Sequence, residues 1–156
     1  MLKNILVLFS LLLVGCSPID NKESSIKIIQ DEPQLLSAIQ KRRLTNKILE
    51  LNKNKDVQLV IKIVSSIPNN GTIESYANEY FNKVGIGKEG RDRGLLILIS
   101  MKSKKIRLEV GRGNEGWLPD HKAHEYTKLA IDNFKESRYY EELEKIVNAI
   151  ENGAGE

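Results

Sequence analysis

The chain has little of what many small secreted domains and enzymes rely on. It has one cysteine, one tryptophan and two histidines in 156 residues. A single cysteine excludes an internal disulfide, so the stability of the fold must come from packing. Basic and acidic residues are nearly balanced, 24 against 21, which gives no support to nucleic-acid binding. No apolar stretch in the sequence is long enough to cross a membrane.

Common catalytic motifs are also missing. The sequence contains no Gly-x-Ser-x-Gly, no His-Glu-x-x-His and no P-loop. The glycines of Gly111-Arg112-Gly113-Asn114-Glu115-Gly116 have the spacing of a dinucleotide fingerprint, but no second strand ending in an acid follows, so we expect no dinucleotide. His121 and His124 have a spacing that suits a metal, but isolated histidines in an exposed helical turn are more often solvated.

The N-terminus has the form of an export signal. Lys3 precedes an apolar run, Ile5 to Val14, that is too short for a membrane-spanning helix and ends next to a small residue, Gly15. We therefore expect residues 1–15 to be a signal peptide that is removed.

Cys16, the only cysteine, directly follows this signal. Leu13-Val14-Gly15-Cys16 resembles the lipobox of bacterial lipoproteins, in which the thiol is diacylated and the chain is cut before the cysteine. The alternative is a plain signal peptide with an unpaired cysteine near the cut. The lipobox predicts a protein of the bacterial cell envelope whose acylated Cys16 enters a lipid bilayer. The residue after the acylated cysteine is a serine, Ser17, and not an aspartate. This resembles the default signal that sorts a lipoprotein to the outer membrane of a double-membraned cell. Residues 16–32 are interpreted as a lipidated tether and residues 33–152 as one domain.

Hydrophobic periodicity predicts alternating helices and strands along this domain. Residues 57–64 and 95–99 have the continuous apolar character of strands that are covered on both faces, whereas residues 106–110 alternate like a half-exposed strand. Thr72 is placed to cap the clearest amphipathic helix. A short apolar run at 26–29 is an edge strand or extended arm. The predicted helices span residues 34–51, with Pro33 in the first turn, and 73–84, 120–135 and 140–151.

This order of elements predicts a layered α/β domain with a mixed sheet. The connection from strand 57–64 to strand 95–99 should make the two parallel, and the short turn before residue 106 should make an antiparallel hairpin. The loop at 88–94 and the loop at 111–119 should then meet at one edge of the sheet. The order of the strands therefore predicts that these two loops form the functional site.

The two loops hold three acids and three arginines. Carboxylates that converge at loop tips can bind a hard cation such as Ca²⁺ or another divalent ion, so Asp92, Glu115 and Asp120 are the candidate metal ligands. In the alternative, Asp120 caps a helix and the other two acids pair with arginines at the surface. The candidate anion-binding residues are Arg91, Arg93 and Arg112.

The ordered motifs resemble the TPM domain, which occurs in thylakoid lumen proteins and bacterial envelope proteins. The resemblance is carried by Ile73-Glu74-Ser75-Tyr76-Ala77, Gly85-Ile86-Gly87, Asp92-Arg93-Gly94-Leu95-Leu96-Ile97-Leu98, Arg107-Leu108-Glu109-Val110-Gly111-Arg112-Gly113-Asn114-Glu115-Gly116 and Arg138-Tyr139-Tyr140. It implies a three-layer α/β/α sandwich, divalent-cation binding in some members and phosphatase activity in a few. The sequence departs from the family pattern in three places. Arg93 stands where the family often has Asn, and Pro119 stands where it usually has Thr or Ser. The C-terminal membrane helix of many bacterial members is missing.

Two function classes follow from the sequence. The first is a lipid-anchored, non-catalytic module that assists envelope membrane proteins, with a cation ordering its loops. The second is a phosphomonoesterase in which a loop-bound metal positions phosphate and the arginines neutralise it. No residue stands out as a nucleophile or base.

Overall fold

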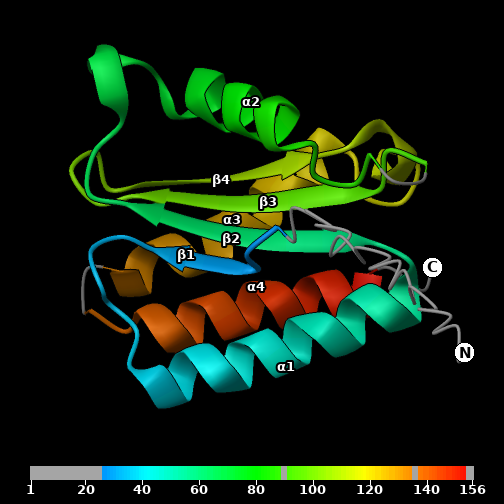
Figure 1. The fold of residues 1–156 in the computed structure, drawn as a ribbon, viewed down its shortest axis with the longest axis horizontal. Coiled ribbons are helices and arrows are strands. Elements are labelled where there is room, and N and C mark those ends of the chain that lie inside the picture. The colour runs from blue at the N-terminus through cyan, green and yellow to red at the C-terminus, as the bar shows by residue number, and fades with distance from the viewer. Residues whose placement is uncertain (1–25, 89–90, 135–136, 154–156) are drawn as a thin grey trace, which may run out of the picture.

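The computed structural model describes residues 26–88, 91–134 and 137–153, which form a four-stranded sheet in the order β1-β2-β3-β4 (Figure 1). The first three strands are parallel, and β4 is antiparallel to β3. The predicted mixed sheet, with its parallel crossover and antiparallel hairpin, is therefore confirmed. The strands are β1 (Ile29–Asp31), β2 (Gln58–Val64), β3 (Gly94–Ser100) and β4 (Lys105–Val110).

Helices cover both faces of this sheet and complete the predicted three-layer sandwich (Figure 1). One face carries α2 (Ile73–Val84), which lies over β3 and β4. The other face carries α1 (Ala38–Lys55), α3 (Asp120–Phe134) and α4 (Tyr139–Gly153). The apolar side chains of β3 divide between two cores: Leu95, Ile97 and Ile99 face the three-helix layer, and Leu96 and Leu98 face α2.

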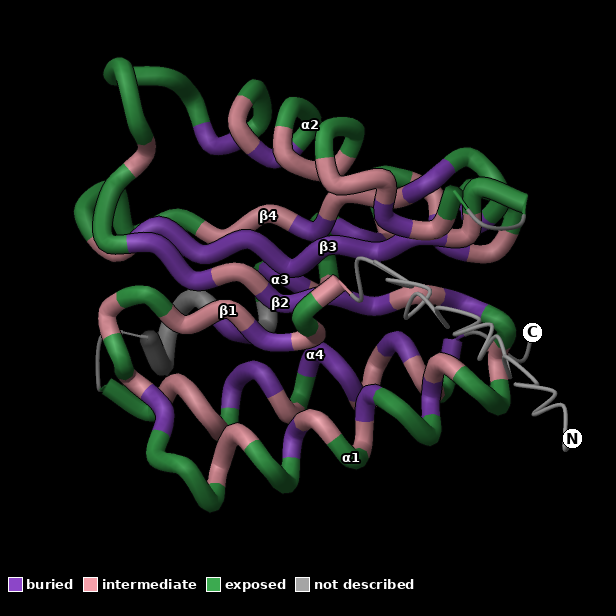
Figure 2. Tube along the Cα trace, viewed as in Figure 1, coloured by how far each residue is buried: buried purple, intermediate pink, exposed green. Residues whose placement is uncertain are grey.

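Burial explains why β3 has no polar alternation. All seven of its residues are buried, because helices pack against both sides of the strand (Figure 2). In β4, the side chains that face α2 are partly exposed, and Arg107 and Glu109 form an ion pair there. The sequence pattern correctly separated the buried strand from the half-exposed one.

The first helix starts later than predicted. Ser37 is its N-cap, and its hydroxyl accepts a hydrogen bond from the Gln40 backbone N–H while the Gln40 side chain accepts one from the Ser37 N–H. This capping box fixes the start at Ala38. Gln34 has a φ of 56°, which is left-handed and incompatible with a helix. Pro33 therefore lies in the preceding turn and not in the first helical turn.

The same helix also ends later than predicted, at Lys55 instead of residue 51. Lys53, Asn54 and Lys55 contain no helix breaker, and basic side chains are favourable in a last turn. Asp56 then adopts a left-handed conformation with a φ of 51°, and its N–H donates to the Asn52 carbonyl. This turn leads directly into β2.

Three smaller boundaries also differ. Ile29–Asp31 pairs with β2, so the end of the proposed tether is an edge strand of the domain. Asp120 is the first residue of α3, and the Ala123 N–H donates to the Pro119 carbonyl, so Pro119 occupies the position predicted for Asp120. The last helix, predicted to end at residue 151, extends to Gly153, which is buried and lies against Tyr126.

Among the described residues, no helix has the length and hydropathy to cross a membrane. The predicted signal peptide and Cys16 lie outside the described part of the chain.

Candidate anion-binding pocket

One edge of the sheet gathers the starts of β2 and β3, the end of β4 and the end of α1 (Figure 1); we call it the pocket edge. The two predicted loops meet here. The Gly113 N–H donates to the Asp92 carbonyl at 3.1 Å, and the Gly111 N–H donates to the Gly94 carbonyl at 2.9 Å. The prediction that these loops come together is confirmed.

Close backbone packing explains two glycines of the second loop, Gly111 and Gly113. A Cβ at Gly113 would lie 1.9 Å from the Arg91 carbonyl oxygen, and a Cβ at Gly111 would lie 2.2 Å from that of Asp92. The N–H groups of both glycines are used inside the protein. Two of the three glycines in the fingerprint-like spacing therefore serve contact between two backbones.

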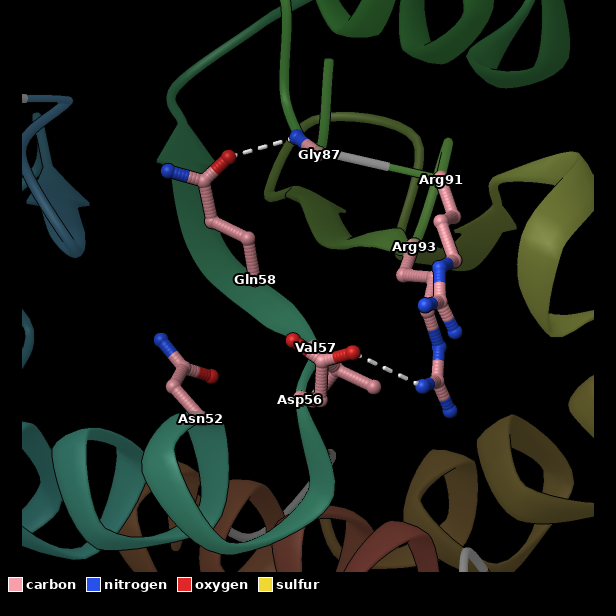
Figure 3. Close-up of a pocket in the computed structure, with 7 residues that line it drawn as sticks. All are labelled: Asn52, Asp56, Val57, Gln58, Gly87, Arg91 and Arg93. Carbon is pink, nitrogen blue, oxygen red and sulfur yellow. Dashed lines mark hydrogen bonds and ion pairs between the residues drawn. The ribbon is translucent and has the colours of Figure 1, made fainter. Parts of the chain in front are cut away.

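An open pocket of about 540 Å³ lies at this edge (Figure 3). It is formed where the end of α1 and the start of β2 face the loop before β3. The lining residues are Asn52, Asp56, Val57, Gln58, Gly87, Arg91 and Arg93.

Each amide side chain of the pocket accepts one backbone hydrogen bond through its oxygen atom. The Asn52 Oδ1 accepts a hydrogen bond from the Leu59 backbone N–H at 2.9 Å, and the Gln58 Oε1 accepts one from the Gly87 N–H. These backbone donors fix the orientation of each amide. What remains for a ligand is the NH₂ group of each side chain, which only donates hydrogen bonds.

Two guanidinium groups add positive charge. Figure 3 shows Arg91 and Arg93 on one side of the pocket, across from Gln58. The Arg93 Nη1 donates to the Asp56 Oδ2 at 3.1 Å, and the Asp56 side chain is 79% exposed. Among the described residues, Arg91 has no ion-pair partner. The pocket thus has one carboxylate, already paired, against two arginines.

Asn114 holds Arg93 from the other side. It is fully buried, its Nδ2 donates to the Gly94 carbonyl at 3.0 Å, and its Oδ1 accepts from Trp117 Nε1 at 3.3 Å and from Arg93 Nε at 3.5 Å. One buried side chain therefore joins both loops and orients an arginine of the pocket.

The structure brings together some of the sequence-predicted site residues. Of the three candidate anion-binding arginines, Arg91 and Arg93 line the pocket, whereas Arg112 is exposed and does not. The three candidate metal ligands, Asp92, Glu115 and Asp120, are all exposed. Within residues 26–88, 91–134 and 137–153, no three His, Cys, Asp or Glu residues form a group that could hold a metal ion. The described side chains thus do not fit a three-carboxylate site, and calcium binding stays a prediction.

Sequence reasoning missed four residues of the site: Asn52, Asp56, Gln58 and Asn114. The first three come from the α1–β2 junction, which was treated only as the end of a helix. The order of elements could have indicated them. Parallel strands begin at the same edge of a sheet, so the turn between α1 and β2 lies at the edge where the loop before β3 also lies. Asn114 stood inside the glycine-rich loop, where nothing in the sequence indicates burial.

A second polar cluster lies on the α2 face, away from the pocket. The Lys62 Nζ is 4.5 Å from the Tyr80 ring centroid and donates to the Gln30 Oε1 at 3.2 Å. Burial lowers the pKa of Lys62, and the charge of Glu32 opposes this effect. Burial also raises the pKa of Tyr80. The cluster holds the Lys62 stem between Tyr80 of α2 and Gln30 of β1.

Comparison with known proteins identifies the domain. A family model described as TPM domain matches residues 29–153. No curated protein matches the chain.

Solved structures share the fold. The N-terminal domain of a P. gingivalis protein has a TM-score of 0.75 at 24% identity, over 84% of this chain and 83% of its own. The N-terminal domain of a Corynebacterium glutamicum protein has a TM-score of 0.67 at 10% identity, over 86% and 84%. The BA42 protein of Bizionia argentinensis has a TM-score of 0.65 at 14% identity, over 77% and 81%. At these identities the likeness shows the fold alone.

Proposed function

We propose that this chain, which belongs to the TPM-domain family, is a lipid-anchored module of the bacterial envelope that binds phosphate-bearing groups in the pocket at its sheet edge. The lipid anchor is acylated Cys16. The pocket is the recognition site of an accessory domain that works beside envelope membrane proteins.

The observation that supports anion binding is the donor-only lining of the pocket. The lining side chains supply two amide NH₂ groups and two guanidiniums, of which the Arg93 guanidinium is shared with the one lining carboxylate, Asp56. A phosphate group is all acceptor and negatively charged, and guanidinium groups match it in shape. A cation or a hydrogen-bond donor would meet a single lining carboxylate, that of Asp56, and Arg93 already shares it.

Phosphate titration tests the pocket. We expect inorganic phosphate or a phosphomonoester to shift the amide resonances of Gln58 and Gly87 in residues 17–156, which contain every described element. Arg93→Gln and Arg91→Gln should each weaken binding about tenfold, since a charged hydrogen bond contributes about 1.5 kcal/mol or more. Lys102→Gln, at the opposite end of the sheet, is the matched control. Equal affinity in all four proteins would refute an anion site at the pocket.

The anchor is tested separately. Cys16→Ser should leave the domain folded and release it from membranes, because no described helix can span a bilayer. A variant that still sediments with membranes after a high-salt wash would contradict lipidation at Cys16.

Phosphomonoester hydrolysis is a second candidate, and the same donor set favours it, since it would hold a phosphoryl group. The described residues supply no evident nucleophile, so the test is direct. If the activity exists, residues 17–156 should hydrolyse an aryl phosphate, and Arg93→Gln should reduce the rate while the fold persists. Hydrolysis at the same rate by both proteins would point to a contaminant.

Calcium binding is the remaining part of the proposal and requires Asp92, Glu115 and Asp120 to converge. A hundredfold excess over Kd would add about 2.7 kcal/mol to the free energy of unfolding and raise Tm by roughly 5 to 10 °C. Asp120→Asn should cancel most of that shift. If millimolar Ca²⁺ leaves the wild-type Tm unchanged, these acids are exposed surface groups.

A further inference from the structure

We infer that the phosphate recognised by the pocket belongs to phospholipid head groups, and that the domain sits with its pocket edge against the membrane that carries its anchor. The inference rests on the proposed lipid anchor and anion pocket. It adds the partner and the orientation of the domain.

The first argument is where the chain enters the fold. Because β1 is parallel to β2, the chain reaches β1 from the side of the sheet where β2 and β3 begin, and this is the pocket edge (Figure 1). Ile26, the first described residue, packs on the core beneath α2. An anchor upstream of Ile26 therefore approaches the domain from the pocket side.

The second argument is the length of the chain between the anchor and the fold. Nine residues, 17–25, separate Cys16 from Ile26. A flexible segment of this length spans on average about 18 Å and at most about 35 Å. The seven residues of β2 alone extend over about 23 Å. Contact of the pocket edge with the bilayer is within the average span of such a segment, whereas contact of the opposite end needs a segment extended beyond that average.

The third argument is the charge around the pocket. Exposed or partly exposed basic side chains end both α1 and α2 at this edge, and Lys88 follows α2. Together with the arginines of the loops, they outnumber the described acids nearby. The basic residues are Lys53, Lys55, Lys83, Lys88, Arg91, Arg93 and Arg112, and the acidic ones are Asp56, Asp92, Glu115, Asp120 and Glu151, in the last turn of α4. Such a surface is attracted to anionic lipid, and the anchor holds the pocket at high effective lipid concentration.

Charge alone does not choose the orientation, because the opposite end is basic too. The turn between β3 and β4 exposes Lys102, Lys104 and Lys105. Those lysines line no described pocket with fixed donors and lie on the side away from the tether. The two ends therefore make a matched pair for an experiment.

The experiment uses the acylated chain, reconstituted in vesicles of phosphatidylglycerol or of phosphatidylcholine, and the Cys16→Ser chain in solution as the reference. Lysine acylation by a water-soluble reagent, followed by mass spectrometry, measures the protection of each lysine. We expect Lys53, Lys55 and Lys88 to be protected several-fold on both vesicles, and more strongly on phosphatidylglycerol, while Lys102 and Lys104 stay as reactive as in solution. Arg91→Gln/Arg93→Gln should reduce this protection, and a Lys102→Gln/Lys104→Gln variant should retain it.

Three outcomes overturn the inference: equal protection of both ends, stronger protection of the hairpin lysines, or protection that the double arginine variant leaves unchanged. Phosphate titration of the Cys16→Ser chain distinguishes failure of the lipid inference from failure of the proposed anion site. If soluble phosphate binds at the pocket but vesicles give no protection there, the pocket serves free phosphate compounds and only the lipid inference fails. If neither binds, the proposed anion site fails as well.

Discussion

The two ends of the β3–β4 pair are built in opposite ways. At the pocket edge, Gly87, Gly94, Gly111 and Gly113 let backbone segments approach so closely that a Cβ at each would lie 2.4 Å or less from a backbone atom. At the hairpin end, Lys104 adopts a φ of 51° in an exposed turn where glycine would fit better. Close backbone contact fixes the loops that form the pocket, whereas the hairpin end carries its charge on exposed lysine side chains. Fixed geometry, and not charge, distinguishes the candidate site.

The strongest test of this contrast is Gly113→Ala. The added Cβ would lie 1.9 Å from the Arg91 carbonyl, so the two loops must separate. We expect a loss of about 3 kcal/mol or more in the free energy of unfolding, as for overpacking against backbone that cannot move. Urea denaturation measures it. Gly116→Ala is the control, because nothing lies within 4 Å of its added Cβ. Similar losses in both variants would mean that close backbone contact is not the cause.

Asn114→Ala should have the next largest effect. It removes one of the two donors of the buried Gly94 carbonyl, which keeps the Gly111 N–H, and leaves the Trp117 indole N–H without its acceptor, so it should destabilise the domain by about 2 kcal/mol. It should also weaken phosphate binding, since Arg93 loses one of its two supports. Thermal unfolding and phosphate titration measure the two effects. Asn54→Ala, on the exposed surface of α1, should change neither. An unchanged Tm in Asn114→Ala would show that water replaces the amide.

Asp31 is the fixed polar group of the hairpin end, at the end of β1. Its carboxylate lies 2.9 Å from Lys41 Nζ and accepts the N–H groups of Leu35 and Leu36 at 3.0 Å each. Burial raises its pKa, but Lys41 and the two N–H groups outweigh burial and hold the pKa below the ordinary value of 3.8.

Because the folded-state pKa is lowered, this carboxylate stabilises the fold above pH 3.8 and loses its contribution as pH falls through the lowered pKa. Asp31→Asn should therefore cost about 1 to 2 kcal/mol at pH 7, and the difference from wild type should shrink below about pH 4. Denaturation curves at several pH values measure this. A difference that stays constant down to pH 2 would assign the cost to lost hydrogen bonds alone. Glu50→Gln, exposed on α1, serves as the control.

The smallest effect is expected at the hairpin turn. Lys104→Gly relieves the left-handed conformation and should change stability by no more than about 1 kcal/mol, in the stabilising direction. The Tm measures it, with Lys102→Gly as the control at a position without positive φ. A clear destabilisation would mean that the Lys104 side chain contributes a contact to the fold.

Local signals in the sequence determined most of the elements. Helix Ile73–Val84 follows from an unbroken apolar stripe, a capping threonine and Gly85, which has a φ of 77° at its end. The start of α1 was misjudged because Pro33 is a good first-turn residue in general, whereas here the Asp31 carboxylate binds Leu35 and Leu36 and holds the chain in a turn. The competing signal, Ser37 followed by Gln40, was local and could have been used.

The meeting of the two loops also followed from the sequence, because the order of strands fixes which ends share an edge. The chemistry of that edge did not. The direction in which an amide points depends on which backbone N–H reaches it, and the N–H groups that orient Asn52 and Gln58 belong to Leu59 and Gly87. The sequence by itself therefore determined the layers, the mixed sheet and the edge at which to look. Only the tertiary structure decided that this edge presents hydrogen-bond donors and leaves its acids exposed, because long-range contacts, not residue types, set the orientation of side chains.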